Sequence, residues 1–92
     1  MSSVDLAAVS ARFTVFGDAD PALLPRIVAL FAKCGLVPAL FRAERLGDEM
    51  NVEVEFTSMI PARADHFAEV LRQLPVVSLV QLRLGAPLGV PS

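Results

Sequence analysis

The chain of 92 residues contains one cysteine, one histidine, and neither tryptophan nor tyrosine. The single cysteine, Cys34, excludes an internal disulfide and any metal or redox motif that requires paired thiolates. A free thiol fits a reducing compartment. Without Trp and Tyr, the core has to be built from aliphatic residues and the six phenylalanines, and an aromatic binding surface is not expected.

Clusters of basic residues and long apolar runs are also missing. The formal charge is −2, so the chain lacks the positive field that draws a protein onto nucleic acid, and we expect no nucleic-acid partner. A membrane span needs roughly 20 consecutive apolar residues, which no run in this sequence approaches. The start of the chain also lacks the basic and apolar segments of a signal peptide. We therefore predict a cytoplasmic protein with no membrane contact.

Apolar residues, by contrast, are abundant and make up 54% of the chain. The length predicts one domain, over residues 11–85, between an N-terminal arm (1–10) and a flexible, Gly- and Pro-rich C-terminal tail (86–92). A body this small has a large surface for its volume, so part of the apolar content stays uncovered in a monomer. We therefore predict a homodimer, a higher oligomer or a larger partner.

The N-terminal half of the domain predicts a strand, a helix and a strand. Segment 12–16 (RFTVF) is rich in the β-branched and aromatic residues that favour strands. Apolar residues then recur with a 3.6-residue period, which predicts a helix that begins at residue 21 or 22 and ends at a Gly35 cap. Segment 36–45 predicts a second strand, and Pro38 places that strand at the edge of a sheet.

The C-terminal half predicts a second strand, helix and strand. Segment 50–56 (MNVEVEF) alternates apolar and polar residues, as in a strand with one buried face. After Ser58 the apolar residues follow helical spacing, with Pro61 where a first turn tolerates proline, and Pro75 ends the helix. Segment 76–84 is the last predicted strand.

This order predicts an α+β fold of the ferredoxin-like βαββαβ type. Two right-handed crossovers in one sheet give a four-stranded antiparallel sheet of order 4-1-3-2, with both helices on one face. On the open face Arg12 then lies beside Glu53 and Glu55, where opposite charges stabilise modestly. Val77 and Leu79 alternate in step with the residues that point to the open face. Apolar side chains are therefore expected on that face at the start of the last strand, which predicts a partner surface there.

No residue or motif indicates an enzyme. His66 is interpreted as a solvated helix residue, and Cys34, on an apolar helix stripe, as a buried and inert thiol. Glu53 and Glu55 point the same way, but strand alternation alone predicts charges there. Phosphate-binding loops, nucleophile elbows and paired cysteines are absent from the sequence. We predict no catalytic residue, no cofactor and no metal.

Segment 13–45 resembles the opening of ACT domains, the small regulatory modules found on enzymes of amino-acid metabolism. Their pattern is a strand, a turn containing Asp-x-Pro-Gly-x-Leu, a helix with Ile or Val one turn on, and a Gly before the second strand. The matching residues are Pro21, Leu23, Leu24, Ile27 and Gly35. A free-standing ACT domain of this length is most similar to the small regulatory subunit of acetolactate synthase, an enzyme of branched-chain amino-acid biosynthesis.

The resemblance implies a ligand site in the turn after the first strand. The candidate ligand-binding residues are Gly17, Asp18, Ala19, Asp20, Ala22, Leu23 and Leu24. Free N–H groups at the start of the helix form a weak anion site that suits a carboxylate, but Asp18 and Asp20 are alternative occupants of these donors as caps. Ala22 stands where the family has a glycine that lets an amino acid approach the backbone.

Two functions follow from these observations. The first is a regulatory module that dimerises through sheet edges, binds a small amino acid at a subunit boundary and acts on the catalytic subunit of a biosynthetic enzyme. The alternative is a ligand-free interaction subunit that docks on such a partner through a sheet edge or the apolar surface of the last strand. Ala22 favours the alternative, whereas the likeness of the strand-turn-helix segment favours the first.

Overall fold

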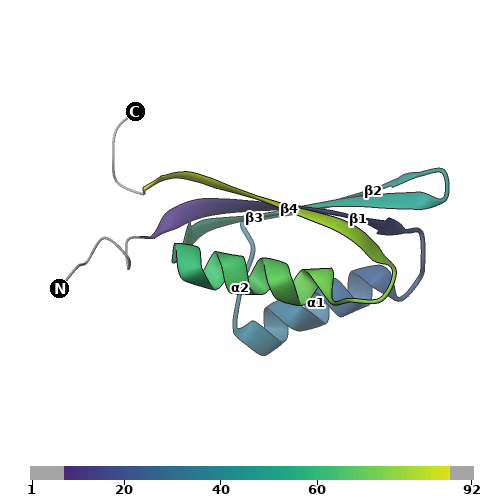
Figure 1. Ribbon diagram of the computed structural model, residues 1–92, viewed down its shortest axis with the longest axis horizontal. Helices are drawn as coiled ribbons and strands as arrows, with labels where there is room; N and C mark the ends of the chain where they lie inside the picture. The colour runs from purple at the N-terminus through teal and green to yellow at the C-terminus, as the bar shows by residue number, and fades with distance from the viewer. Residues whose placement is uncertain (1–7, 88–92) are drawn as a thin grey trace.

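A computed structural model describes residues 8–87 and contains one sheet with two helices (Figure 1). In chain order the elements are β1 (Val9–Asp18), α1 (Leu23–Cys34), β2 (Leu40–Leu46), β3 (Glu49–Met59), α2 (Pro61–Arg72) and β4 (Val77–Pro87). The strands are ordered β2-β3-β1-β4, and every neighbouring pair is antiparallel. Both helices lie on the same side of the sheet (Figure 1). The predicted fold and strand order are therefore confirmed.

The strands are longer or shorter than local sequence signals indicate. β1 begins at Val9 and so takes in the last two residues of the predicted arm, while residues 1–7 lie outside the described residues. β4 runs to Pro87, into the predicted tail, of which 88–92 are not described. The cause is tertiary, because Val9 pairs with Pro87 on one side and Met59 on the other, and paired strands continue wherever a partner supplies hydrogen bonds.

β2 lies at an edge of the sheet, as Pro38 indicated, but it begins at Leu40 rather than at residue 36. The proline therefore precedes the strand instead of interrupting it, because a residue without an N–H cannot donate to the ladder.

Local signals set the ends of both helices. α1 starts at Leu23, slightly later than predicted, because the Leu23 N–H closes a turn onto the Asp20 carbonyl oxygen at 3.0 Å. Pro25 still falls in the first turn, where its missing N–H costs nothing. Gly35 has φ 69° and donates back to the last turn of α1, as expected of a left-handed glycine cap. α2 begins with Pro61, as predicted.

The core lies between the sheet and the helices and is centred on four phenylalanines. Phe13 makes edge-to-face contacts with Phe56 and Phe67, at centroid distances of 5.8 and 5.2 Å. Phe31 of α1 contacts Phe56 in the same geometry. Such pairs add to the stabilisation from burial alone. Aromatic residues thus join both helices to the middle of the sheet.

A bulge in β4 separates two residues that were predicted to share a face. Phe16 pairs with Leu79, but Gly17 pairs with Val77, so Ser78 is an extra residue in the ladder. Val77 therefore turns toward the core and packs against it, while Leu79 remains on the open face with 49% of its surface exposed. One inserted residue reverses the face of the sheet to which the side chains beyond it point.

Charged residues occupy the open face in the predicted arrangement. Arg12 forms an ion pair with Glu55 of β3, and Arg42 of β2 lies 3.4 Å from Glu53. On its other side Arg12 faces Arg83 of β4. Like charges directly opposite one another on neighbouring strands are destabilising.

Replacing Arg83 with glutamate is expected to stabilise the fold by about 0.2–1 kcal/mol, because it converts a repulsive cross-strand pair into an attractive one. Thermal unfolding at low ionic strength measures the effect, and Arg83→Gln is the control that removes only the repulsion. A melting temperature for Arg83→Glu at or below that of Arg83→Gln would contradict this account of the pair.

Candidate functional site

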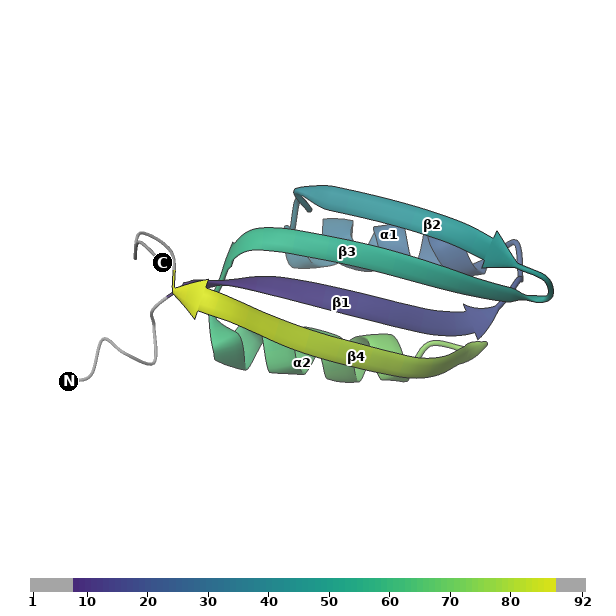
Figure 2. The ribbon, with the colours of Figure 1, turned by 90° about the horizontal axis from the view of Figure 1, so that it is seen from above.

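The loop predicted to bind a ligand lies at one end of the sheet. It occupies residues 19–22 between β1 and α1, beside the β2–β3 turn and the connection into β4 (Figure 2). The Asp18 N–H donates to the Val76 carbonyl oxygen at 2.9 Å, and the Ala19 N–H donates to the Asp48 carbonyl oxygen at 2.8 Å. Backbone hydrogen bonds thus join three separate connections at this end.

Gly17 is required by a close approach of two backbones. A Cβ atom at this position would lie 2.4 Å from the Val76 carbonyl oxygen. Val76 itself has φ 64°, a left-handed conformation that a β-branched residue rarely adopts. The contact therefore fixes where the loop leaves the sheet, and Gly17 acts as a structural residue at the border of the site.

Most N–H groups at the start of α1 are already hydrogen-bonded. The Asp20 carboxylate accepts from the Ala22 N–H at 2.8 Å, and the Asp20 carbonyl oxygen accepts from Leu23. Pro25 has no N–H to donate. Within residues 8–87, the Leu24 N–H is therefore the one donor of the first turn that has no hydrogen-bond acceptor. Asp20 thus fills one donor, as the capping alternative expected, and one N–H stays open at the positive end of the helix.

Acidic side chains surround this end of the loop. Asp18 is exposed at the end of β1, and Glu49 is its partner on β3. Asp48, in the adjoining turn, is exposed as well. No ion pair within the described part of the chain involves these three carboxylates. The three carboxylates therefore place negative charge along this end of the sheet, beside the loop.

The predicted site residues divide into structural and accessible ones. Leu23 is fully buried in the core, and Leu24 is half-buried against it. Asp18 is exposed, while Ala19, Asp20 and Ala22 are half-buried at the surface. A ligand at this loop would therefore contact the polar residues and the backbone of the loop rather than the side chains of Leu23 and Leu24.

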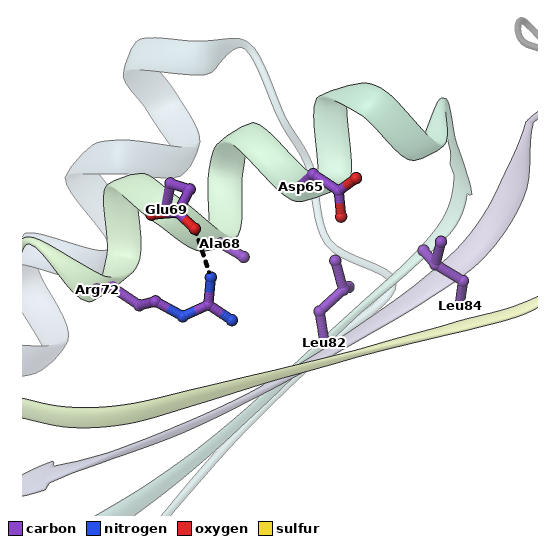
Figure 3. A pocket seen from close by; sticks show the side chains of 6 residues that line it. All are labelled: Asp65, Ala68, Glu69, Arg72, Leu82 and Leu84. Carbon is purple, nitrogen blue, oxygen red and sulfur yellow. Dashed lines mark hydrogen bonds and ion pairs between the residues drawn. The ribbon is translucent and has the colours of Figure 1, made fainter.

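A hollow of about 430 Å³ lies between α2 and β4 (Figure 3). The side chains that line it are Asp65, Ala68, Glu69, Arg72, Leu82 and Leu84. Arg72 donates to Glu69 at 2.9 Å and to the Val80 carbonyl oxygen at 3.1 Å. Its guanidinium is thus engaged in fastening the end of α2 to β4.

An apolar groove between α1 and β2 was not found by sequence reasoning, which placed the exposed apolar surface on the last strand. Its lining includes Val28, Phe31, Ala32, Leu36, Val37 and Phe41. Val37 is 88% exposed and Phe41 is 38% exposed. The sequence signal for this groove is the apolar run that continues past Gly35, and that run by itself predicts a strand.

The remaining reactive side chains do not assemble into a site. His66 is exposed on α2, and Cys34 is half-buried at the end of α1 rather than fully buried. Neither side chain makes a hydrogen bond within residues 8–87. In the same range no group of three or more His, Cys, Asp or Glu residues is placed to hold a metal ion, and neither helix is long and apolar enough to cross a membrane.

The fold is similar to that of known domains. No curated protein matches the chain in sequence. The ACT domain from the GTP pyrophosphokinase of Chlorobium tepidum superposes with a TM-score of 0.73 at 10% identity, covering 83% of this chain and 99% of that one. The C-terminal domain of the MgtC protein from Mycobacterium tuberculosis gives a TM-score of 0.66 at 17% identity, covering 88% and 92%. A family model of the ACT-like domain matches residues 4–87, nearly the whole sequence, and the chain therefore belongs to the ACT-like domain family.

Proposed function

We propose that this chain is a non-catalytic regulatory module that binds a small amino acid at the loop between β1 and α1. Membership of the ACT-like family supports the proposal, because ACT domains are in general regulatory modules that bind small molecules. The observation that carries it is the pairing of opposite recognition elements at one loop, an open N–H at Leu24 and an exposed carboxylate at Asp18.

These elements match the two charged groups of an amino acid. The carboxylate of the ligand accepts the Leu24 N–H at the positive end of the α1 dipole. The ammonium group lies at the acidic rim formed by Asp18, Asp48 and Glu49, where hydrogen bonds to charged groups are stronger than neutral ones. Ala22 stands where the family pattern has a glycine. Its methyl group narrows the space through which a ligand reaches the backbone, and this favours a small ligand.

The partner in this proposal is the catalytic subunit of a cytoplasmic enzyme of amino-acid biosynthesis. The finer assignment to acetolactate synthase, with a branched-chain amino acid as effector, rests on the sequence resemblance alone. The two structural neighbours described above come from a GTP pyrophosphokinase and from MgtC. Copurification of a biosynthetic enzyme with the tagged full chain tests this part of the proposal.

Ligand binding is tested by thermal unfolding of the full chain in the presence of each of the common amino acids. A ligand at 100 times its dissociation constant stabilises the folded state by about 2.7 kcal/mol, which raises the melting temperature of a domain this size by roughly 10–20 °C. We expect one amino acid, or a chemically related group, to produce such a shift.

Asp18→Asn is expected to weaken that binding about tenfold or more, because it removes a charge-assisted hydrogen bond to the ammonium group. Asp65→Asn is the matched control, since it makes the same change on an exposed residue of α2. Equal affinities for the two variants would place the ligand elsewhere on the domain.

One observation favours the alternative of a ligand-free interaction subunit. The Asp20 carboxylate already occupies the Ala22 N–H, so the helix start has fewer donors than an open anion site. Under this alternative no amino acid shifts the melting temperature of the wild-type chain or of Ala22→Gly, while a catalytic partner still copurifies.

A further inference from the structure

Two arginines face each other on the open face of the sheet. Arg12 of β1 and Arg83 of β4 are directly opposite partners in the antiparallel ladder, on the face that lies toward the viewer in Figure 2, opposite the helices. The Cβ atoms of such partners are about 4.5–5.5 Å apart, so both guanidinium groups reach the same space above the sheet. The pair is unfavourable by itself, and residues that break a local rule of stability often belong to a functional site.

Neighbouring carboxylates do not offset all of this positive charge. Glu55 forms an ion pair with Arg12, and Glu53 lies 3.4 Å from Arg42 of β2. Both glutamates are therefore already engaged with an arginine. The Arg83 side chain is exposed, and no ion pair or side-chain hydrogen bond in the described part of the chain involves it. Its charge thus has no counter-charge there.

A hollow of about 490 Å³ lies over this part of the sheet, which is within the size range of small-molecule sites. Its lining includes Arg12, Thr14, Glu53, Gln81 and Arg83. Thr14 and Gln81 are opposite partners on the same two strands as the arginines. Neither side chain makes a hydrogen bond within residues 8–87. The hollow therefore combines two guanidinium groups with a hydroxyl and an amide that are all able to donate.

We propose that these four side chains form an anion site that binds the phosphate group of a small phosphorylated molecule. Arg12 and Arg83 donate to the phosphate oxygens, because the planar guanidinium presents parallel N–H groups that match them. Thr14 and Gln81, one step along the same strands, donate to hydroxyl groups on the organic part of the ligand. A phosphate with about −1.5 to −2 charge then replaces the repulsion between the arginines with two attractive contacts.

The arrangement favours a phosphate over a carboxylate. Two guanidinium groups offer more N–H donors than the two oxygens of one carboxylate accept, whereas a phosphate monoester has three free oxygens. Glu55 engages one terminal nitrogen of Arg12, and the remaining N–H groups of that guanidinium stay available because it has five.

The anion site is separate from the loop between β1 and α1. Asp18 lies at the other end of β1, roughly 20 Å from Arg12 at the rise of a strand. Asp48 and Glu49 adjoin that end, so its negative charge repels a phosphate, whereas the arginine pair attracts one. The inference therefore goes beyond the proposed function and does not rest on it.

The test titrates the full chain with glycerol 3-phosphate and with inorganic phosphate, at constant ionic strength, by isothermal titration calorimetry. We expect saturable binding with a dissociation constant of about 1 mM or lower, and tighter binding of glycerol 3-phosphate, which carries hydroxyl groups. Arg83→Gln is expected to weaken the binding of both probes about tenfold or more. Because this variant relieves the repulsion with Arg12, it is expected to be at least as stable as the wild type, so unfolding does not account for the loss.

Arg26→Gln is the matched control, because it makes the same change on an exposed arginine of α1, on the other side of the sheet (Figure 1). Its affinity for both probes is expected to equal that of the wild type. Thr14→Val is expected to remove only the advantage of glycerol 3-phosphate over inorganic phosphate.

Absence of saturable binding, or equal affinities for Arg83→Gln and Arg26→Gln, would overturn the proposal. Equal affinities of the wild type for the two probes would overturn the role of Thr14 and Gln81 and identify free phosphate as the ligand. Asp18→Asn is expected to bind phosphate as the wild type does. Phosphate binding and amino-acid binding are therefore lost in different variants, and failure of one proposal is distinguishable from failure of the other.

Discussion

Replacing Phe13 with alanine is expected to lower the free energy of unfolding by about 3–5 kcal/mol, the range for removing a large aromatic side chain from a core. Phe13 has no exposed surface, and its ring contacts Phe56 at 5.8 Å and Phe67 at 5.2 Å. The substitution removes both aromatic pairs and leaves a cavity between β1, β3 and α2. Small domains have a total stability of about 5–15 kcal/mol, so the variant is expected to be partly unfolded at moderate temperature.

Urea denaturation measures this loss, with the midpoint and the slope fitted separately. Phe16→Ala is the matched control, because Phe16 lies on the same strand but points to the open face and is half-buried. Its cost is expected to be about 1 kcal/mol. Both variants are compared at one protein concentration. Equal losses for the two would mean that the core is not centred on Phe13.

Gly17→Ala is expected to destabilise the fold by about 3 kcal/mol, the upper end of the range for overpacking. The added Cβ would lie 2.4 Å from the Val76 carbonyl oxygen, and a backbone atom has no rotamer by which to move away. Either β4 shifts from β1, or the loop carrying Asp18 moves. Both outcomes disturb the hydrogen bond from the Asp18 N–H to the Val76 carbonyl oxygen.

Gly85→Ala provides the matched control on another strand. Its added Cβ would meet the Ser10 hydroxyl oxygen at 2.0 Å, but a serine hydroxyl moves aside by rotation about χ1. We expect a change within about 0.5 kcal/mol for this variant. Thermal and urea unfolding of the two variants separates a clash with the backbone from the general cost of adding a methyl group. A Gly17→Ala variant as stable as Gly85→Ala would contradict the observed approach of β4 to β1.

Some parts of the fold could be predicted because the signal lies within a few neighbouring residues. The alternation in segment 50–56 predicted a strand with one buried face, and Val52, Val54 and Phe56 are buried. Gly35 predicted the end of α1, where its left-handed conformation is observed. The order of the elements then left few ways to form the sheet, because crossover connections are right-handed.

The candidate site was predicted only as a segment. The turn formers between 17 and 21 located the loop, but residues far away in the chain determine its geometry. The carbonyl groups of Asp48 and Val76 hold Ala19 and Asp18, and neither pairing follows from local spacing. Which N–H of the helix start remains open likewise depends on how the Asp20 carboxylate and carbonyl are oriented.

Taken by itself, the sequence determined the element types and the strand order, because these depend on periodicity and on local residue preferences. Only the tertiary structure decided where β1 and β4 end, that Ser78 bulges and turns Val77 inward, and that α1 and β2 enclose an apolar groove. Those features depend on which distant residues supply hydrogen bonds and packing surface. Such partners are specified only once the whole chain has folded.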